Sequence, residues 1–183
     1  MTDRDPFRAN YETSQELMDL LRYGAETLSL EFTRWGEQYV SGPGLYFLVV
    51  ADANYGEYTD PLGANRWPIE QSRVVSESTD AFVEAAREVA FACDGAVVVA
   101  ADGTVQEQMV RVRSPSPDEM DADDLGYADW MGTKHMSALE VSTRDEVLWA
   151  VTLSEENGRV TSFLNGTYQD YPREEIGGRW RPR

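Results

Sequence analysis

Hydrophobic side chains recur at helical spacing in two stretches of this chain. Between residues 14 and 34, leucines and a tyrosine return every three or four positions, which predicts a helix with one apolar face. Thr13, with Glu16 three residues later, has the form of a capping box and predicts where this helix begins. Ser78-Thr79-Asp80 predicts the start of a second helix, since such side chains cap well. Its inner face would hold Phe82, Val83, Ala86, Val89 and Ala90.

Short apolar runs bounded by turn residues predict the strands. Residues 45–50 follow Gly42-Pro43-Gly44 and are predicted to form a buried strand. Residues 94–100 come directly after the second helix and are predicted to form another strand. Asp102-Gly103 would turn this strand into residues 104–112, which predicts a hairpin between the two.

The last third of the chain repeats this pattern. Residues 147–153 and 159–164 are predicted to pair as a hairpin across the Asn157-Gly158 turn. Residues 132–142 are predicted to form a helix that begins after a Gly-Thr pair. The remaining signals indicate loops or turns over residues 52–70, 114–126 and 165–166. Helices interleaved with strands favour an α/β fold: a single domain with a central mixed β-sheet flanked by helices. The length of 183 residues fits one such domain.

The charge balance restricts the partners of this protein. The chain has 33 Asp plus Glu against 16 Lys plus Arg, a formal net charge of -17. Such acidity resembles proteins of salt-accumulating haloarchaea, and it opposes binding to nucleic acid, whose phosphates require a basic face. No apolar run approaches the roughly 20 residues that span a bilayer, and the N-terminus lacks a secretory segment. A single cysteine excludes an internal disulfide, so we expect a cytoplasmic protein.

The chain has one lysine and one histidine, and the two are neighbours: Lys134 and His135, directly after Gly132 and Thr133. Free N–H groups and the positive dipole end of a helix that starts here would favour a phosphate. Thr133 would add a hydroxyl donor, Lys134 a charge, and His135 a donor or a metal ligand. The alternative is an ordinary threonine cap with two solvated bases.

Two more segments carry candidate chemistry at strand ends. Asp94-Gly95-Ala96 combines a carboxylate with a residue that lets a ligand approach the backbone closely. Ser154-Glu155-Glu156 offers a hydroxyl for a phosphate and carboxylates for Mg²⁺ or Mn²⁺. Each segment alone is also compatible with a plain turn. The chain has no Gly-X-Ser-X-Gly elbow, no P-loop and no zinc ligand set. The functions that remain after these exclusions are metal-assisted phosphoryl or nucleotidyl transfer and simple nucleotide binding.

At these residues the chain resembles the diadenylate cyclase family, whose catalytic domain carries a DGA motif, a GTRHRAA motif and a later SEE motif. The matching segments are 94–96, 132–138 and 154–156, and the likeness covers about residues 40–168. The resemblance and the sequence patterns together predict three parts of the chain. These are an N-terminal helical segment (1–40), a diadenylate cyclase-like catalytic domain (41–170) and a C-terminal tail (171–183), of which 177–183 would be loose and basic.

The resemblance implies an activity and an assembly. A diadenylate cyclase joins two ATP molecules into cyclic di-AMP and releases pyrophosphate, with Mg²⁺ or Mn²⁺. Two domains meet face to face in at least a homodimer, and each holds one ATP. Each ribose 3′-hydroxyl then attacks the α-phosphate that the other subunit binds.

The resemblance also implies residue roles. Asp94 would be the catalytic residue that orients or helps deprotonate the 3′-hydroxyl. Asp94 and His135 would be the metal ligands. The substrate-binding residues would be Gly95, Ala96, Gly132, Thr133, Lys134, His135, Ser154 and Glu155.

Three positions depart from the GTRHRAA motif, and one of them is Ser137 in place of the first alanine. Lys134 replaces the first arginine, so a bidentate fork becomes a point charge. Met136 replaces the second arginine and cannot bind a phosphate, unless another arginine supplies the contact: Arg111, Arg113 or Arg144. This departure supports a second hypothesis, a catalytically weakened nucleotide-binding regulatory protein of the same fold. A third hypothesis is an unrelated α/β domain in which short motifs coincide.

Overall fold

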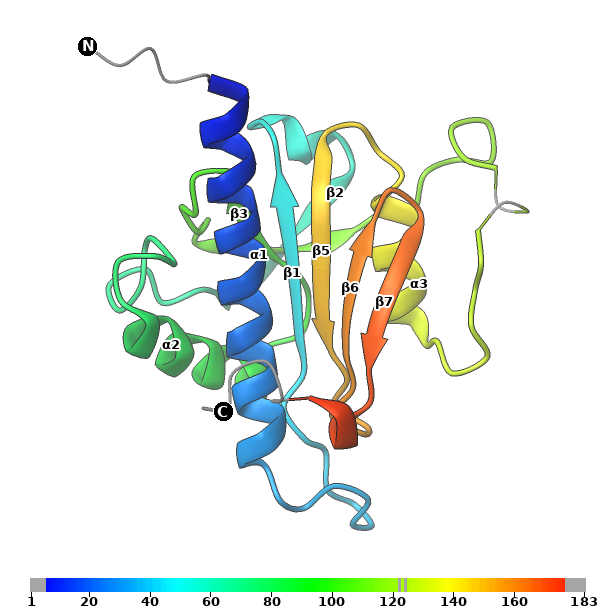
Figure 1. Ribbon diagram of the computed structural model, residues 1–183. Helices are drawn as coiled ribbons and strands as arrows, with labels where there is room; N and C mark the ends of the chain where they lie inside the picture. The colour runs from blue at the N-terminus through cyan, green and yellow to red at the C-terminus, as the bar shows by residue number, and fades with distance from the viewer. Residues whose placement is uncertain (1–5, 122, 124, 177–183) are drawn as a thin grey trace.

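The fold is built on a five-stranded mixed sheet, described from a computed structural model that covers residues 6–121, 123 and 125–176 (Figure 1). The strand order is β3-β1-β5-β6-β7. Neighbouring strands are antiparallel, except that β1 and β3 run parallel. The strands are β1 (Leu45–Val50), β3 (Val97–Ala100), β5 (Val147–Leu153), β6 (Val160–Leu164) and β7 (Thr167–Tyr171). The α/β fold with a central mixed sheet, predicted from the sequence, is confirmed.

Helices cover both faces of this sheet. In Figure 1, α1 (Pro6–Glu31) crosses one face with α2 (Thr79–Ala92) beside it, and α3 (Thr133–Val141) lies behind the other face. Side chains of β1 alternate between two hydrophobic clusters, because successive residues of a strand point to opposite faces. Phe47 and Val49 pack with α1 and α2, and Leu48 and Val50 pack with α3. All six residues of β1 are therefore buried.

The first helix begins earlier than predicted. Thr13 and Glu16 lie within α1, so the capping box does not mark its start. Pro6 takes the first helical position instead, where a missing N–H and a preset φ favour helix formation. The second helix begins as predicted, and the Ser78 hydroxyl accepts a hydrogen bond from the N–H of Ala81 at 3.3 Å.

A strand lies within the segment predicted to be a loop. β2 (Thr59–Arg66) pairs antiparallel with β4 (Gln108–Val112) in a separate two-stranded sheet. The register of this pair shifts between Pro61 and Arg66, and such an irregular outer strand tolerates proline and glycine. The predicted hairpin between 94–100 and 104–112 is present in part, as irregular antiparallel pairing rather than a regular two-stranded ladder. Isolated bridges join Ala96 to Val110 and Val99 to Val105, and the N–H of Gln106 donates to the carbonyl of Val98 at 2.9 Å. The regular partners differ, since β3 runs parallel beside β1 and β4 pairs with β2.

The predicted turn at Asn165-Gly166 joins β6 to a further strand, β7, which the sequence patterns did not reveal. Both turn residues have positive φ (47° and 74°), as a two-residue type I′ hairpin requires. The side chains of β7 are mostly half-buried or exposed, so no clear apolar alternation marks this strand in the sequence. The predicted basic tail, 177–183, lies outside the described residues. Within the described ranges, no helix combines the length and apolarity needed to cross a membrane.

Truncating a buried leucine of α1 should destabilise the whole fold, because α1 contributes to the same core as the sheet. Leu21 is 0% exposed and Leu164 is 54% exposed. We expect Leu21→Ala to lower the free energy of unfolding by about 2–5 kcal/mol. The matched Leu164→Ala should change it by less than about 0.5 kcal/mol. Denaturant unfolding measures both, and equal losses would contradict the packing of α1.

Candidate functional site

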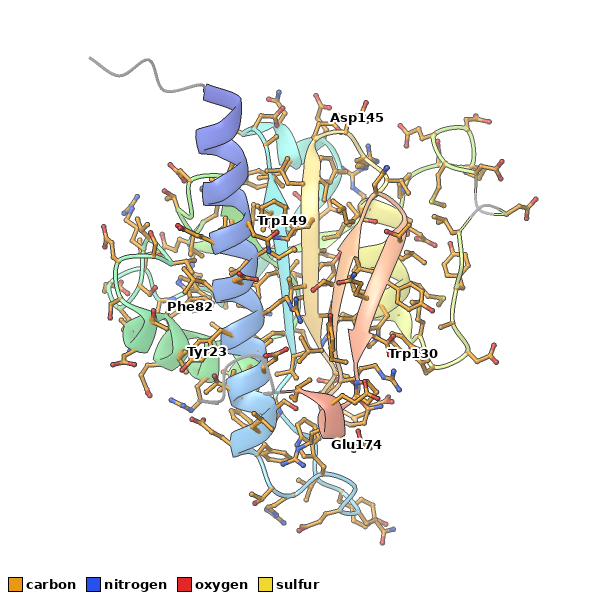
Figure 2. All side chains as sticks on the ribbon, in the orientation of Figure 1. Tyr23, Phe82, Trp130, Asp145, Trp149 and Glu174 are labelled. Carbon is orange, nitrogen blue, oxygen red and sulfur yellow. The ribbon has the colours of Figure 1, made fainter. Side chains whose placement is uncertain are left out.

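A cleft of about 800 Å³ opens at one edge of the sheet. The strand register explains its position, since Phe47 lies opposite both Val97 of parallel β3 and Val151 of antiparallel β5. Gly44, Asp94 and Ser154 lie three residues from Phe47, Val97 and Val151, respectively, in the direction of this edge. The register therefore brings these three residues to the same edge of the sheet. The first turn of α3 completes the cleft. Figure 2 shows Trp130 at this end of the sheet, beside α3, and Asp145 at the opposite end. The volume suits one small-molecule ligand.

The three segments selected from the sequence meet in this cleft. They come from the start of β3, the start of α3 and the end of β5, and no two of them are adjacent in the sequence. Every residue predicted to bind substrate or metal lines it: Asp94, Gly95, Ala96, Gly132, Thr133, Lys134, His135, Ser154 and Glu155.

The start of α3 presents unpaired N–H groups to the cleft. Gly132 is the N-cap residue, in an extended conformation, and it provides no side-chain cap. Its carbonyl accepts the first helical hydrogen bond, from the N–H of Met136 at 3.0 Å. The N–H groups of Thr133, Lys134 and His135 therefore have no partner within the helix. Together with the helix dipole, they make this end of α3 suitable for an anion.

Lys134 is half-buried among the acidic residues of the cleft. Burial lowers the pKa of its ammonium, while the charges of Glu155 and Asp94 act in the opposite direction. The tip of Lys134 packs against Gly44, since a Cβ on Gly44 would lie 3.0 Å from Nζ and 3.1 Å from Oε2 of Glu155. A residue without a side chain is thus needed at position 44 if Lys134 and Glu155 are to keep these places.

His135 is buried and neutral near pH 7. It is 7% exposed, and its ring packs edge-on against Trp130 with centroids 5.0 Å apart. Burial, followed by the charges of Lys134 and Arg159, lowers its pKa to about 4. Its buried Nε2 has no hydrogen-bond partner among the described residues. A neutral imidazole with a free nitrogen retains the capacity to bind a metal.

The donor set of the cleft fits a divalent ion only in part. Asp94 and His135, the predicted metal ligands, both line the cleft. Within the described ranges, no three His, Cys, Asp or Glu side chains lie close enough to hold an ion by themselves. Mg²⁺ in phosphate-transfer sites usually has one or two protein carboxylates and takes further ligands from phosphates and water. These residues therefore fit an ion that arrives with a phosphate ligand.

Ser154 has its hydroxyl oriented by a tight turn. The side chain is 7% exposed, and Oγ accepts a hydrogen bond from the N–H of Glu156 at 3.3 Å. Its backbone is held on both sides, because the Ser154 N–H donates to the carbonyl of Arg159 and its carbonyl accepts from Gly158. The hydroxyl proton remains able to donate to a ligand. Glu155 is exposed beside it.

Gly95 is required by the packing of the protein itself. Its φ is +104°, and a Cβ there would lie 2.2 Å from Cδ1 of Leu62 and 2.9 Å from the carbonyl oxygen of Val110. Leu62 of β2 therefore makes one close approach to Gly95, and the approach of a ligand stays a prediction. The same strand holds the neighbouring residue, since Asn65 donates a hydrogen bond to the carbonyl of Asp94 at 2.9 Å.

Sequence reasoning missed several residues of the cleft. Tyr46 of β1 lies within hydrogen-bond distance of Ser137, with their oxygens 3.2 Å apart, and burial raises the pKa of its phenol. Trp130 and Arg159 also line the cleft. Arg159 directly follows the turn formed by residues 154–158. Its closeness to the SEE motif in the sequence was the signal that could have identified it as a residue of the cleft. The further cleft-lining residues are Leu62, Val110, Arg111, Val112, Ser114, Met136, Ser137, Glu140, Glu156 and Asn157.

Of the three arginines considered from the sequence, only Arg111 lines the cleft. Its side chain is 71% exposed and lies 3.5 Å from a carboxylate oxygen of Asp60. Arg113 also contacts Asp60, at 3.4 Å, and donates to the carbonyl of Glu57. Arg144 packs over the Tyr58 ring at 4.7 Å and does not line the cleft.

Fold and cleft define a single α/β domain with a mixed sheet and a polar site at one sheet edge. No family model matches the chain, and no curated protein matches it in sequence. Solved structures are similar to it in fold. A double cysteine mutant of DacA from Staphylococcus aureus is 14% identical with a TM-score of 0.50, over 87% of this chain and 89% of that one. A hypothetical membrane spanning protein from Bacillus cereus is also 14% identical, with a TM-score of 0.53, over 84% of this chain and 62% of that one.

A side chain at position 95 should be costly because of Leu62. We expect Gly95→Ala to lower the free energy of unfolding by about 1–3 kcal/mol, through its positive φ and the clash. Adding Leu62→Ala should recover about 1 kcal/mol relative to the sum of the two single losses. Gly63→Ala is the control, since its φ is +59° and a Cβ there meets nothing within 4 Å. Strict additivity of Gly95→Ala and Leu62→Ala would contradict the contact.

His135 should make the fold sensitive to acid. The pKa is about 4 in the folded protein against 6.5 for an ordinary histidine. Between these values only the unfolded chain binds the proton, so stability is lost as the pH falls through this window. Compared with His135→Asn, the free energy of unfolding of the wild type should fall more steeply with acidification, by at most about 1.4 kcal/mol per pH unit. Denaturant unfolding at constant salt measures this, and parallel curves would contradict it.

Proposed function

We propose that the protein is a diadenylate cyclase, which condenses two ATP molecules into cyclic di-AMP and releases two pyrophosphates. The observation that carries this proposal is the meeting of residues 94–96, 132–135 and 154–155 in one cleft. These are the segments that resemble the three family motifs. The fold neighbour DacA is a diadenylate cyclase, and its likeness in fold supports the same activity.

The cleft offers groups of the right kind for the triphosphate of ATP. The unpaired N–H groups of α3, the Thr133 hydroxyl and the Lys134 ammonium would bind the triphosphate. The Ser154 hydroxyl would donate to the terminal phosphates and so stabilise the pyrophosphate as it leaves. Such groups act by positioning and by neutralising charge that develops in the transition state.

Asp94 would act on the nucleophile. Its exposed carboxylate at the mouth of the cleft would accept the proton of a ribose 3′-hydroxyl as the oxygen attacks phosphorus. A Mg²⁺ or Mn²⁺ ion held by Asp94, the phosphate oxygens and the neutral His135 would neutralise charge on the phosphates. Asp94 would also orient the 3′-hydroxyl, and the buried, edge-packed ring of His135 would fix the direction of its nitrogen.

A second copy of the chain is required by the product. Cyclic di-AMP contains two phosphodiester bonds, so each ATP must serve once as nucleophile and once as electrophile. A cleft of about 800 Å³ suits one ATP rather than two. Two chains that meet face to face, each with one ATP, would bring each 3′-hydroxyl to the α-phosphate held by its partner.

One observation favours a second candidate, a nucleotide-binding regulatory protein of weakened activity. Met136 lines the cleft with 38% of its surface exposed, where the family motif has an arginine. A thioether cannot donate a hydrogen bond to a phosphate. A protein without this contact would still bind a nucleotide through the start of α3.

Synthesis of cyclic di-AMP tests the proposal directly. Purified protein at high salt is given ATP and Mn²⁺, and cyclic di-AMP is quantified by mass spectrometry. We expect Asp94→Asn to lower the rate by about 10²- to 10⁴-fold, the range for loss of a general base. The control is Asp145→Asn, at the opposite end of β5, which should keep the full rate.

Two results would overturn parts of this proposal. Product formation that persists equally in Asp94→Asn would exclude the assigned role of Asp94. An absence of product in wild-type protein that binds ATP would favour the regulatory candidate.

A further inference from the structure

Arg159 is a charged residue of the cleft to which the family motifs assign no role. It follows the turn after Ser154 and precedes β6, and its carbonyl accepts a hydrogen bond from the Ser154 N–H at 2.9 Å. This bond continues the antiparallel pairing in which Leu153 lies opposite Val160. This bond fixes Arg159 next to Ser154, on the side of β5 that faces away from β1.

Two contacts hold the guanidinium in place. It lies over the Trp130 ring, with Cζ 4.3 Å from the ring centroid, and its Nη1 forms an ion pair with Asp170. The register Tyr46–Thr152–Thr161–Asp170 puts Asp170 on the same face of the sheet as Tyr46, whose hydroxyl meets Ser137 of α3. Asp170, the ion-pair partner of Arg159, therefore lies on the face of the sheet that α3 and the cleft share.

The guanidinium is not fully satisfied by these contacts. Its Nε is buried and has no hydrogen-bond partner among the described residues, and the side chain is 19% exposed. A buried donor without an acceptor costs free energy, which a ligand acceptor would recover. Arg111, the other arginine of the cleft, is 71% exposed and not constrained in this way.

Arg159 also lies close to the start of α3. The Trp130 ring contacts both the guanidinium of Arg159 and the ring of His135. Met136, which follows His135, lines the same cleft. A planar fork with spare donors therefore lies beside the segment that binds the phosphates in the proposed function, and that segment lacks an arginine of its own.

We propose that Arg159, held by Trp130 and Asp170, binds the phosphate chain of ATP and replaces the arginine contact that Met136 cannot make. This inference rests on the proposed function of the cleft and names a further residue for it. A guanidinium fork matches two phosphate oxygens at once, and a pre-oriented side chain loses little entropy on binding. Asp170 and Trp130 position Arg159 and need not touch the substrate.

Binding of ATP and of adenosine separates a phosphate contact from a structural role. We expect Arg159→Gln to weaken ATP binding by about 10- to 100-fold, the effect of losing a charged hydrogen bond, with adenosine affinity unchanged. Arg159→Lys should lose less, because it keeps the charge and the stem over Trp130. Arg66→Gln is the control, a half-exposed arginine outside the cleft that is paired with Glu107. Equal losses for ATP and adenosine would overturn the proposal.

A rescue experiment provides the sharper test. Adding Met136→Arg to Arg159→Gln restores a guanidinium on the segment where the family carries one. We expect the double variant to recover at least about 5-fold in ATP affinity over Arg159→Gln. Thermal unfolding checks that each variant is folded, and if Arg159→Gln is not, Arg159→Lys and its double variant with Met136→Arg take its place. Failure of Met136→Arg to improve ATP binding would count against the proposal.

The two proposals can fail independently. If the wild type makes cyclic di-AMP, and Arg159→Gln equals it in ATP affinity and in rate, then the role of Arg159 is wrong and the proposed activity is right. If the wild type makes no product but Arg159→Gln weakens ATP and tripolyphosphate binding, Arg159 is still a phosphate contact and the proposed activity is wrong.

Discussion

The pairing of β1 with β3 on one side and β5 on the other is the constraint on which the rest of this structure depends. β1 is buried along its whole length, so its side chains must alternate between the two hydrophobic clusters. A shift of one residue would move Phe47 and Leu48 to the wrong faces. The register that avoids this also brings Asp94 and Ser154 to the same sheet edge, on either side of Gly44. Packing of the core and assembly of the cleft are therefore one requirement.

Charge within the cleft follows from that geometry. In a chain of net charge -17, the single lysine is half-buried at this edge, between the charges of Asp94 and Glu155. Burial lowers the pKa of both Lys134 and His135. For Lys134 the charges of Glu155 and Asp94 oppose this shift, whereas for His135 the nearby charges of Lys134 and Arg159 lower the pKa further. The site thus places a lysine next to acidic side chains and a neutral imidazole in a buried position, two groups that suit different parts of a metal-bound phosphate.

Much of the fold could be predicted from local patterns. The apolar run 45–50, the Ser78 cap and the Asn165-Gly166 turn each produced the expected element, because their signals lie within a few residues. β2 and β7 were missed for a physical reason. Pro61 and Gly63 are tolerated in β2 only because it is an irregular outer strand, and β7 has no strongly apolar face. Residues 104–112 meet their expected partner only through irregular bridges, and the pairing of β4 with β2 was not predicted.

The sequence by itself determined the class of fold and the three short segments that resemble a known site. Their residue types and order are local properties of the chain, and so a reader of the sequence can find them. Only the tertiary structure decided that they share one cleft, that Leu62 packs closely against Gly95, and that Trp130 and Arg159 belong to the site. The register of β1 with strands about 50 and 100 residues away sets these contacts, and no local pattern contains that information.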